Sequence, residues 1–127
     1  MPPTRLSRLE LKIMDALWSR GPLSIREMQE AFPDGRRPAY STVQTTVYRM
    51  EAKGALRRAR KIGNAHIFEP LVSRQAAQRR LIDDLLDLFG GRAQPLVVQL
   101  LGSGRLSMED VREAARVAEE LRRKEAP

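Results

Sequence analysis

Cysteine is absent from this sequence of 127 residues. Disulfide bonds, thiolate metal sites and cysteine nucleophiles are therefore excluded, and we expect a protein of the reducing cytoplasm. Long apolar runs are also missing, because no stretch approaches the ~18 residues that span a bilayer. The N-terminal residues "MPPTRLSRLE" lack the apolar core of a signal peptide. The sequence thus predicts neither export nor insertion into a membrane.

Groups typical of a catalytic site are scarce as well. His66 is the single histidine, and the acidic residues are scattered or grouped as Asp83, Asp84 and Asp87, which we interpret as a solvated helix face. A cation held between Asp83 and Asp87 would need further oxygen ligands. The glycines of "FGGRAQ" lack the Lys-Ser/Thr pair that completes a phosphate-binding loop. We therefore expect no catalytic residues, no metal and no cofactor, and a protein that is not an enzyme.

Basic residues, in contrast, are plentiful and unevenly placed. The formal net charge is +7 and the isoelectric point is about 10.7, while 42% of the residues are hydrophobic, which is typical of a folded basic protein. Residues 35–68 hold eight basic residues against the single acid Glu51, so this window alone carries a net +7. A polyanionic partner is the natural expectation. The eight are Arg36, Arg37, Arg49, Lys53, Arg57, Arg58, Arg60 and Lys61.

Two short helices are predicted at the start of the chain. Ser7 with Glu10 three residues later forms a capping box, and the following apolar residues keep helical spacing until Gly21 ends the helix before a proline. Ser24 with Glu27 forms a second capping box, which opens a helix that ends before the turn-rich segment "PDGRRP". The pattern indicates two helices joined by a tight turn.

The next segment, "AYSTVQTTVYRMEAKGAL", has the β-branched composition of a strand but the spacing of a helix. Val43, Val47 and Met50 recur at intervals of four and three, and Gly54 is a good C-terminal cap. The spacing predicts a helix from about Tyr40 to Lys53.

Two extended runs follow, at residues 55–60 and 65–69, around a turn in which Gly63 and Asn64 are expected to supply the positive φ angles of a hairpin. Three helices followed by a basic hairpin form a winged helix-turn-helix. The sequence thus predicts a mainly α fold with a small β-hairpin wing, and we place this DNA-binding domain at residues 1–72. The candidates for the core-facing side of the hairpin are Leu56 and Ile67.

The third helix carries the side chains that a reading helix needs. Short hydrogen-bonding residues near its N-terminus suit close approach to base edges in the major groove. Ser41, Gln44, Thr45 and Tyr48 share one face, with Thr42 at its edge. Ser41 and Gln44 could instead form a third capping box, the face could be merely solvated, and Tyr48 could cover the edge of the core. The candidate DNA-binding residues are Arg36, Arg37, Tyr40, Ser41, Thr42, Gln44, Thr45, Tyr48, Arg49, Arg57, Arg58, Arg60, Lys61 and Asn64.

Residues 73–127 are expected to form three further helices. Ser73 caps the first, Pro95 stands at the first position of the second, and Ser107 with Asp110 caps the third. So short a segment cannot enclose a core, yet it has apolar residues on more than one face, so we expect a two-fold homodimer. The candidate dimerisation residues are Leu81, Leu85, Leu86, Phe89, Leu96, Val97, Leu100 and Leu101.

Four blocks in this order resemble the BlaI/MecI family of penicillinase repressors: "LSRLELKIMDALW", "YSTVQTTVYRMEAKGAL", "FEPLVS" and "FGG…LVVQLL…LSMEDVREA". The resemblance implies a homodimeric transcriptional repressor whose winged helices bind double-stranded DNA at a palindromic operator and whose C-terminal helices form the dimer.

The same resemblance implies inactivation by a membrane-bound sensor protease that responds to a β-lactam. In several members the cut lies between asparagine and phenylalanine, and the matching pair here is Gln99–Leu100. Copper-responsive relatives use C-terminal cysteines, which this chain lacks. Two alternatives stay open: a winged-helix regulator of another family that responds to a small molecule, and a winged helix that binds other proteins.

Overall fold

The computed structural model describes residues 5–125, so the outermost ends of the two expected domains, residues 1–4 and 126–127, lie outside the described part. Contacts within the chain divide it into two compact units, the first ending at Leu81 and the second beginning at Ile82. The expectation of a mainly α fold with a small β wing is confirmed. The elements are α1 (Arg8–Arg20), β1 (Leu23–Ser24), α2 (Ile25–Glu30), the 3₁₀ turn η1 (Asp34–Arg36), α3 (Tyr40–Lys53), β2 (Leu56–Ile62), β3 (Ala65–Pro70), α4 (Arg74–Leu88), α5 (Ala93–Gly102) and α6 (Met108–Glu125).

The first two helices begin at the capping boxes that the sequence predicts. The Glu10 N–H donates to Ser7 Oγ at 3.2 Å, and the Ser7 N–H donates to Glu10 Oε1 at 2.7 Å. Ser24 and Glu27 repeat this reciprocal pair at 3.2 and 2.9 Å. Each box satisfies two N–H groups that a helix N-terminus would otherwise leave unpaired.

Helix α3 has the predicted bounds but lacks a capping box. Its N-cap is Ala39, which makes no side-chain hydrogen bond, so Ser41 lies in the first turn. Val43, Val47 and Met50 are fully buried, which confirms the predicted inward face. At its C-terminus the helix ends on Gly54, whose φ of 81° is the left-handed conformation that glycine adopts without strain.

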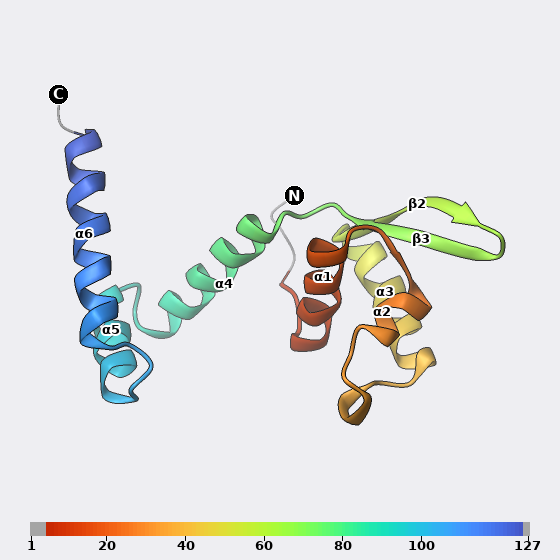
Figure 1. Ribbon diagram of the computed structural model, residues 1–127, viewed down its shortest axis with the longest axis horizontal. Helices are drawn as coiled ribbons and strands as arrows, with labels where there is room; N and C mark the ends of the chain where they lie inside the picture. The colour runs from red at the N-terminus through yellow and green to blue at the C-terminus, as the bar shows by residue number, and fades with distance from the viewer. Residues whose placement is uncertain (1–4, 126–127) are drawn as a thin grey trace. The chain divides into compact units, whose positions relative to one another are not determined.

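The wing is part of a three-stranded antiparallel sheet with strand order β1-β3-β2. The sequence predicts only the β2–β3 hairpin; β1 has just two residues, too few to show an alternating pattern, and Leu23 of β1 pairs with Phe68. Figure 1 shows the hairpin extending beyond the helices of its unit. One detail of the predicted turn is wrong: Gly63 has a φ of 59°, but Asn64 does not have a positive φ. Glycine at the first central position alone meets the requirement of a type II′ turn.

The core of the first unit lies between α1, α2, α3 and the sheet. Leu56 and Ile67 are buried as predicted. Phe68, which was not predicted from the sequence, is the largest fully buried side chain among the described residues. The segment before α4 and the first turns of this helix pack on the same unit, since Trp18 Nε1 donates to the Val72 carbonyl at 2.9 Å and Ala77 of α4 is buried. Helix α3 and the wing thus pack on one shared core, which contains Val47, Leu56 and Phe68.

The second unit consists of the later turns of α4 together with α5 and α6. Ser107 and Asp110 form the predicted reciprocal cap, at 2.9 and 3.0 Å. The expectation that Pro95 occupies the first helical position is wrong, because α5 begins at Ala93. Pro95 is then at the third position, where its missing N–H costs nothing because N–H groups of the first turn have no partner within the helix. From residue 82 to residue 125, all within the described range, no residue is buried.

Candidate nucleic-acid interface

The outer face of α3 is polar and exposed. Ser41, Thr42, Thr45 and Arg49 are exposed along it, opposite the buried apolar residues. Thr46, which lies on the inner side, is buried and its hydroxyl donates to the Thr42 carbonyl at 2.7 Å. The structure thus brings the short hydroxyl side chains of the predicted reading face together on one surface.

Gln44 and Tyr48 of this face contact each other. Gln44 Nε2 donates to the Tyr48 hydroxyl oxygen at 3.2 Å, one helical turn away. Gln44 is half-buried, while Tyr48 is 44% exposed. More than half of the surface of Tyr48 is covered, so the alternative in which it covers the edge of the core stays open beside the reading role.

The cations of the wing fall into two groups. Arg57 pairs with Glu69 at 2.5 Å, and Arg58 pairs with Glu51 at 3.0 Å. Arg60 and Lys61 are exposed and form no ion pair with any residue in the described range. Only the second group has its full charge available to an external anion.

Of the two arginines before α3, Arg37 forms an ion pair within the described range and Arg36 does not. Arg37 pairs with Asp34 at 3.2 Å and donates to the Phe32 carbonyl at 3.0 Å and the Glu30 carbonyl at 3.1 Å. Glu30 is the last residue of α2 and Phe32 follows it closely, so Arg37 caps the C-terminal end of that helix. Arg36 is exposed and has no partner among the residues that the structure describes. Among the candidate DNA-binding cations, those that form no ion pair with a described residue are therefore Arg36, Arg49, Arg60 and Lys61.

The charge of Lys53 is not available to an external anion, because it is balanced by the buried carboxylate of Glu10. Its ammonium lies 2.9 and 3.0 Å from the two carboxylate oxygens of Glu10, whose side chain is 2% exposed. Burial would raise the pKa of Glu10, but hydrogen bonds from Ser7 and the charge of Lys53 outweigh it and leave that pKa below its ordinary value. The pair fastens the start of α1 to the end of α3.

A groove of about 460 Å³ lies between α2, α3 and the wing. Two of its lining residues, Arg26 and His66, are not among the DNA-binding residues predicted from the sequence. Arg26 lies over the Tyr40 ring at 5.4 Å from its centroid, and His66 is half-buried on β3. Asn64 lines the groove from the hairpin turn, so the predicted turn residue and the reading helix border the same depression.

Residues 5–125 contain no cluster of three or more histidine, cysteine or acidic side chains able to hold a metal ion. No helix in that range has both the length and the apolar character needed to cross a membrane.

The candidate dimerisation residues all retain exposed apolar surface. Leu81, Leu85, Val97 and Leu101 are each about 40% exposed. Leu86, Phe89, Leu96 and Leu100 are half-buried. Gln99 of the predicted cleavage pair is exposed on α5 and Leu100 follows it within the same helix.

Comparison with known proteins finds a family model, related sequences and a solved structure that are similar to this chain. The family model described as "Penicillinase repressor" matches residues 6–120. The protein called transcriptional regulator BlaI in two strains of Mycobacterium tuberculosis is 37% identical over 84 residues, which is 65% of this chain and 60% of the relative, so the chain spans less than two thirds of the length of these relatives. A solved transcriptional regulator of Thermotoga maritima is 20% identical, with 91% of this chain and 73% of that one covered and a TM-score of 0.45.

Proposed function

Because the chain belongs to the penicillinase repressor family, we propose that it is a dimeric transcriptional repressor that binds an inverted-repeat operator in double-stranded DNA. The family is one of transcriptional regulators and not of enzymes. In this proposal residues 1–72 are the DNA-binding domain, residues 73–127 the dimerisation domain, and the protein works in the cytoplasm.

The observation that carries the proposal is the combination of an exposed polar face on α3 with unpaired cations on both sides of it. Short polar side chains are suited to reading base edges, and flanking cations are suited to phosphates. Arg36 precedes the helix, Arg49 lies on it, and Arg60 and Lys61 lie on the wing. This placement suits a complex in which α3 lies in the major groove and the flanking cations contact the DNA backbone on either side.

Dimerisation is supported by the second unit's lack of a buried core. Helices whose apolar residues stay exposed in the isolated chain are stabilised when another surface covers them. A second copy of the same unit provides such a surface with two-fold symmetry, which a palindromic operator mirrors.

Inactivation by a sensor protease is the regulatory part of the proposal. The Gln99–Leu100 peptide bond lies inside α5, so cleavage there requires this helix to unwind locally. Co-expression with a sensor protease of the family should yield a fragment ending at Gln99, detected by mass spectrometry. An intact chain after induction would reject this mode of control.

The experiment that tests the function is selection of bound sites from a random pool of DNA duplexes. We expect an enriched palindrome whose half-sites are about one helical turn, ~34 Å, or a multiple of it, apart. Failure to enrich any motif would reject sequence-specific DNA binding and favour a protein-binding winged helix. Enriched DNA whose binding is abolished by a compound found in a thermal-shift screen would favour the small-molecule regulator.

A further inference from the structure

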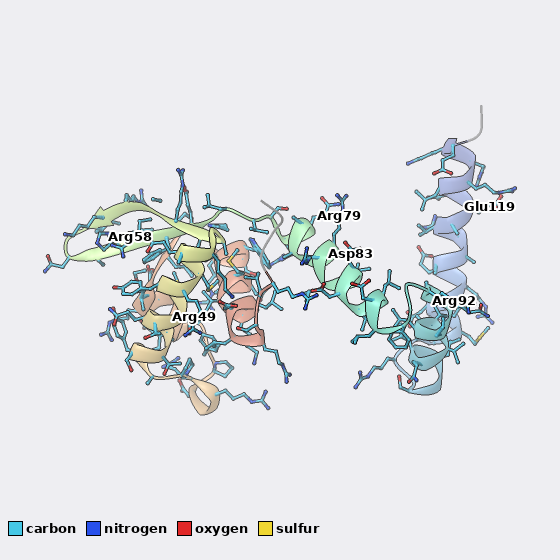
Figure 2. All side chains as sticks on the ribbon, turned by 180° about the vertical axis from the view of Figure 1, so that it is seen from behind. Arg49, Arg58, Arg79, Asp83, Arg92 and Glu119 are labelled. Carbon is cyan, nitrogen blue, oxygen red and sulfur yellow. The ribbon has the colours of Figure 1, made fainter. Side chains whose placement is uncertain are left out.

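Arg58 occupies the junction between the wing and the reading helix. Its Nε donates to Glu51 Oε2 at 3.0 Å, and its guanidinium lies 5.4 Å from the centroid of the Tyr48 ring and 5.7 Å from that of Phe68. Glu51 and Tyr48 belong to α3, while Arg58 belongs to β2 and Phe68 to β3. One side chain thus contacts α3 and both strands of the wing. Figure 2 labels Arg58 on the hairpin and Arg49 on α3.

The contacts continue from Tyr48 along α3. Its hydroxyl oxygen accepts the hydrogen bond from Gln44 Nε2, so the Tyr48 O–H and the side-chain oxygen Oε1 of Gln44 have no partner among the described residues. A connected series therefore runs from Glu51 through Arg58 and Tyr48 to Gln44. Its last two members are on the exposed face that would meet base edges.

We propose that Arg58 is a positioning residue that holds Tyr48 and, through it, Gln44 in the orientation needed to read bases. The proposal rests on the proposed function and assigns Arg58 a role other than phosphate contact. Glutamine loses considerable rotamer freedom when it is fixed, so a side chain already held in place binds with a smaller entropic cost. A guanidinium that lies over both rings supplies this restraint, because the rings attract the cation while its Nε donates to a carboxylate.

The neighbouring cations provide the contrast. Arg60 and Lys61, on the same strand, have no ion pair within the described range and contact neither tyrosine through a ring stack. We therefore assign phosphate contacts to Arg60 and Lys61, because no neighbouring acid in the described range balances their charges. The charge of Arg58 is already balanced by Glu51. Replacing Arg60 or Lys61 should change the salt dependence of DNA binding. Replacing Arg58 should change the preference among base pairs.

The DNA experiment compares three variants on the selected operator and its single-base variants, by fluorescence anisotropy at several salt concentrations. The paired variant Arg58→Ala with Glu51→Ala removes no net charge. We expect it to lower discrimination at the base pairs opposite Gln44 and Tyr48 by about fivefold, with an unchanged salt slope, since a phosphate contact would change the slope by about 0.9 per site.

Arg58→Lys should lose the same discrimination, because lysine keeps the charge but not the flat stacking face. The control Arg60→Ala should reduce the slope and leave base preference intact.

A second measurement needs no DNA. The chain has two tyrosines, Tyr40 and Tyr48, so 3-fluorotyrosine gives two ¹⁹F resonances that Tyr40→Phe assigns. In the paired variant the Tyr48 resonance should move while that of Tyr40, which lies against Arg26, stays in place. Circular dichroism on the same samples confirms that the fold is retained.

The outcomes separate the inference from the function beneath it. If wild-type protein enriches no DNA motif, the proposed function fails. If it binds a motif but the paired variant keeps its base preference with a reduced salt slope, Arg58 is a phosphate contact and the positioning role is wrong. An unmoved Tyr48 resonance would overturn the positioning role whatever the DNA result.

Discussion

In the proposed dimer, replacing Arg49 with alanine should remove one phosphate contact from each half. Arg49 is exposed on α3, beside the polar reading face, and forms no ion pair or hydrogen bond with another described side chain. Its charge is therefore available to a phosphate without first breaking an internal bond. In a dimer on a palindrome both copies carry the substitution, so two contacts are lost together.

The size of the effect follows from counterion release. Each phosphate contact contributes about −0.9 to the slope of log K against log salt, so two lost contacts reduce the slope by about 1.8. For a fourfold rise in salt, each contact changes the affinity by about 3.5-fold and two contacts by about twelvefold. The advantage of the wild type over Arg49→Ala should thus shrink by about twelvefold between about 50 and 200 mM salt.

The assay is anisotropy titration of the selected operator at five salt concentrations. Arg105→Ala is the matched control, because Arg105 is exposed in the loop between α5 and α6 and its replacement removes the same charge. The control should leave the slope unchanged. An equal reduction in both variants would show that the slope follows net charge alone, and an unchanged slope for Arg49→Ala would remove Arg49 from the phosphate contacts.

Three further substitutions test the fold and the dimer. Leu85→Asp places a charge on the proposed apolar interface and should give monomers in analytical ultracentrifugation; a dimer that survives moves the interface elsewhere. Glu10→Gln should lower the free energy of unfolding by about 1–3 kcal/mol at pH 7, because Lys53 loses its buried partner. The pKa of Glu10 is lowered by folding, so its stabilisation is present above the ordinary value of 4.5 and is lost as pH falls through the folded pKa. Urea unfolding should therefore show the wild type and Glu10→Gln converging below about pH 4.5; a constant gap down to pH 3 would contradict the ion-pair explanation. Gly54→Ala should cost about 1 kcal/mol, or about 4–8 °C in Tm, because alanine is strained at positive φ; an unchanged Tm would show that the helix end rearranges freely.

Features set by neighbouring residues could be predicted from the sequence. A capping box such as Ser7 with Glu10 involves side chains three residues apart, and the helix C-terminus at Gly54 depends on one glycine. Helical spacing likewise identified the buried side of α3 despite its β-leaning composition. Local chemistry and periodicity were sufficient there, because each outcome depends on residues within one or two turns.

The placement of β1 could not be predicted in this way. A strand of two residues is too short to show an alternating pattern. Leu23 adopts a strand conformation because it pairs with Phe68 of β3, which is far away in the sequence. The φ angle of Asn64 depends on the type of hairpin turn, since a type I′ turn needs a positive φ at both central residues and a type II′ turn only at the first. The start of α5 two residues before Pro95 also escaped prediction, since the first turn of a helix tolerates proline at more than one position.

The sequence by itself determined that this chain has a basic central window, a helix with one polar and one apolar side, and helices without enough residues to enclose a second core. Only the tertiary structure decided which cations of the window face outward. Arg58 meets Glu51 across the junction of helix and wing, and Lys53 meets Glu10 from 43 residues away. A charge counts toward an external partner only when no internal partner reaches it, and that depends on distances in space rather than along the chain.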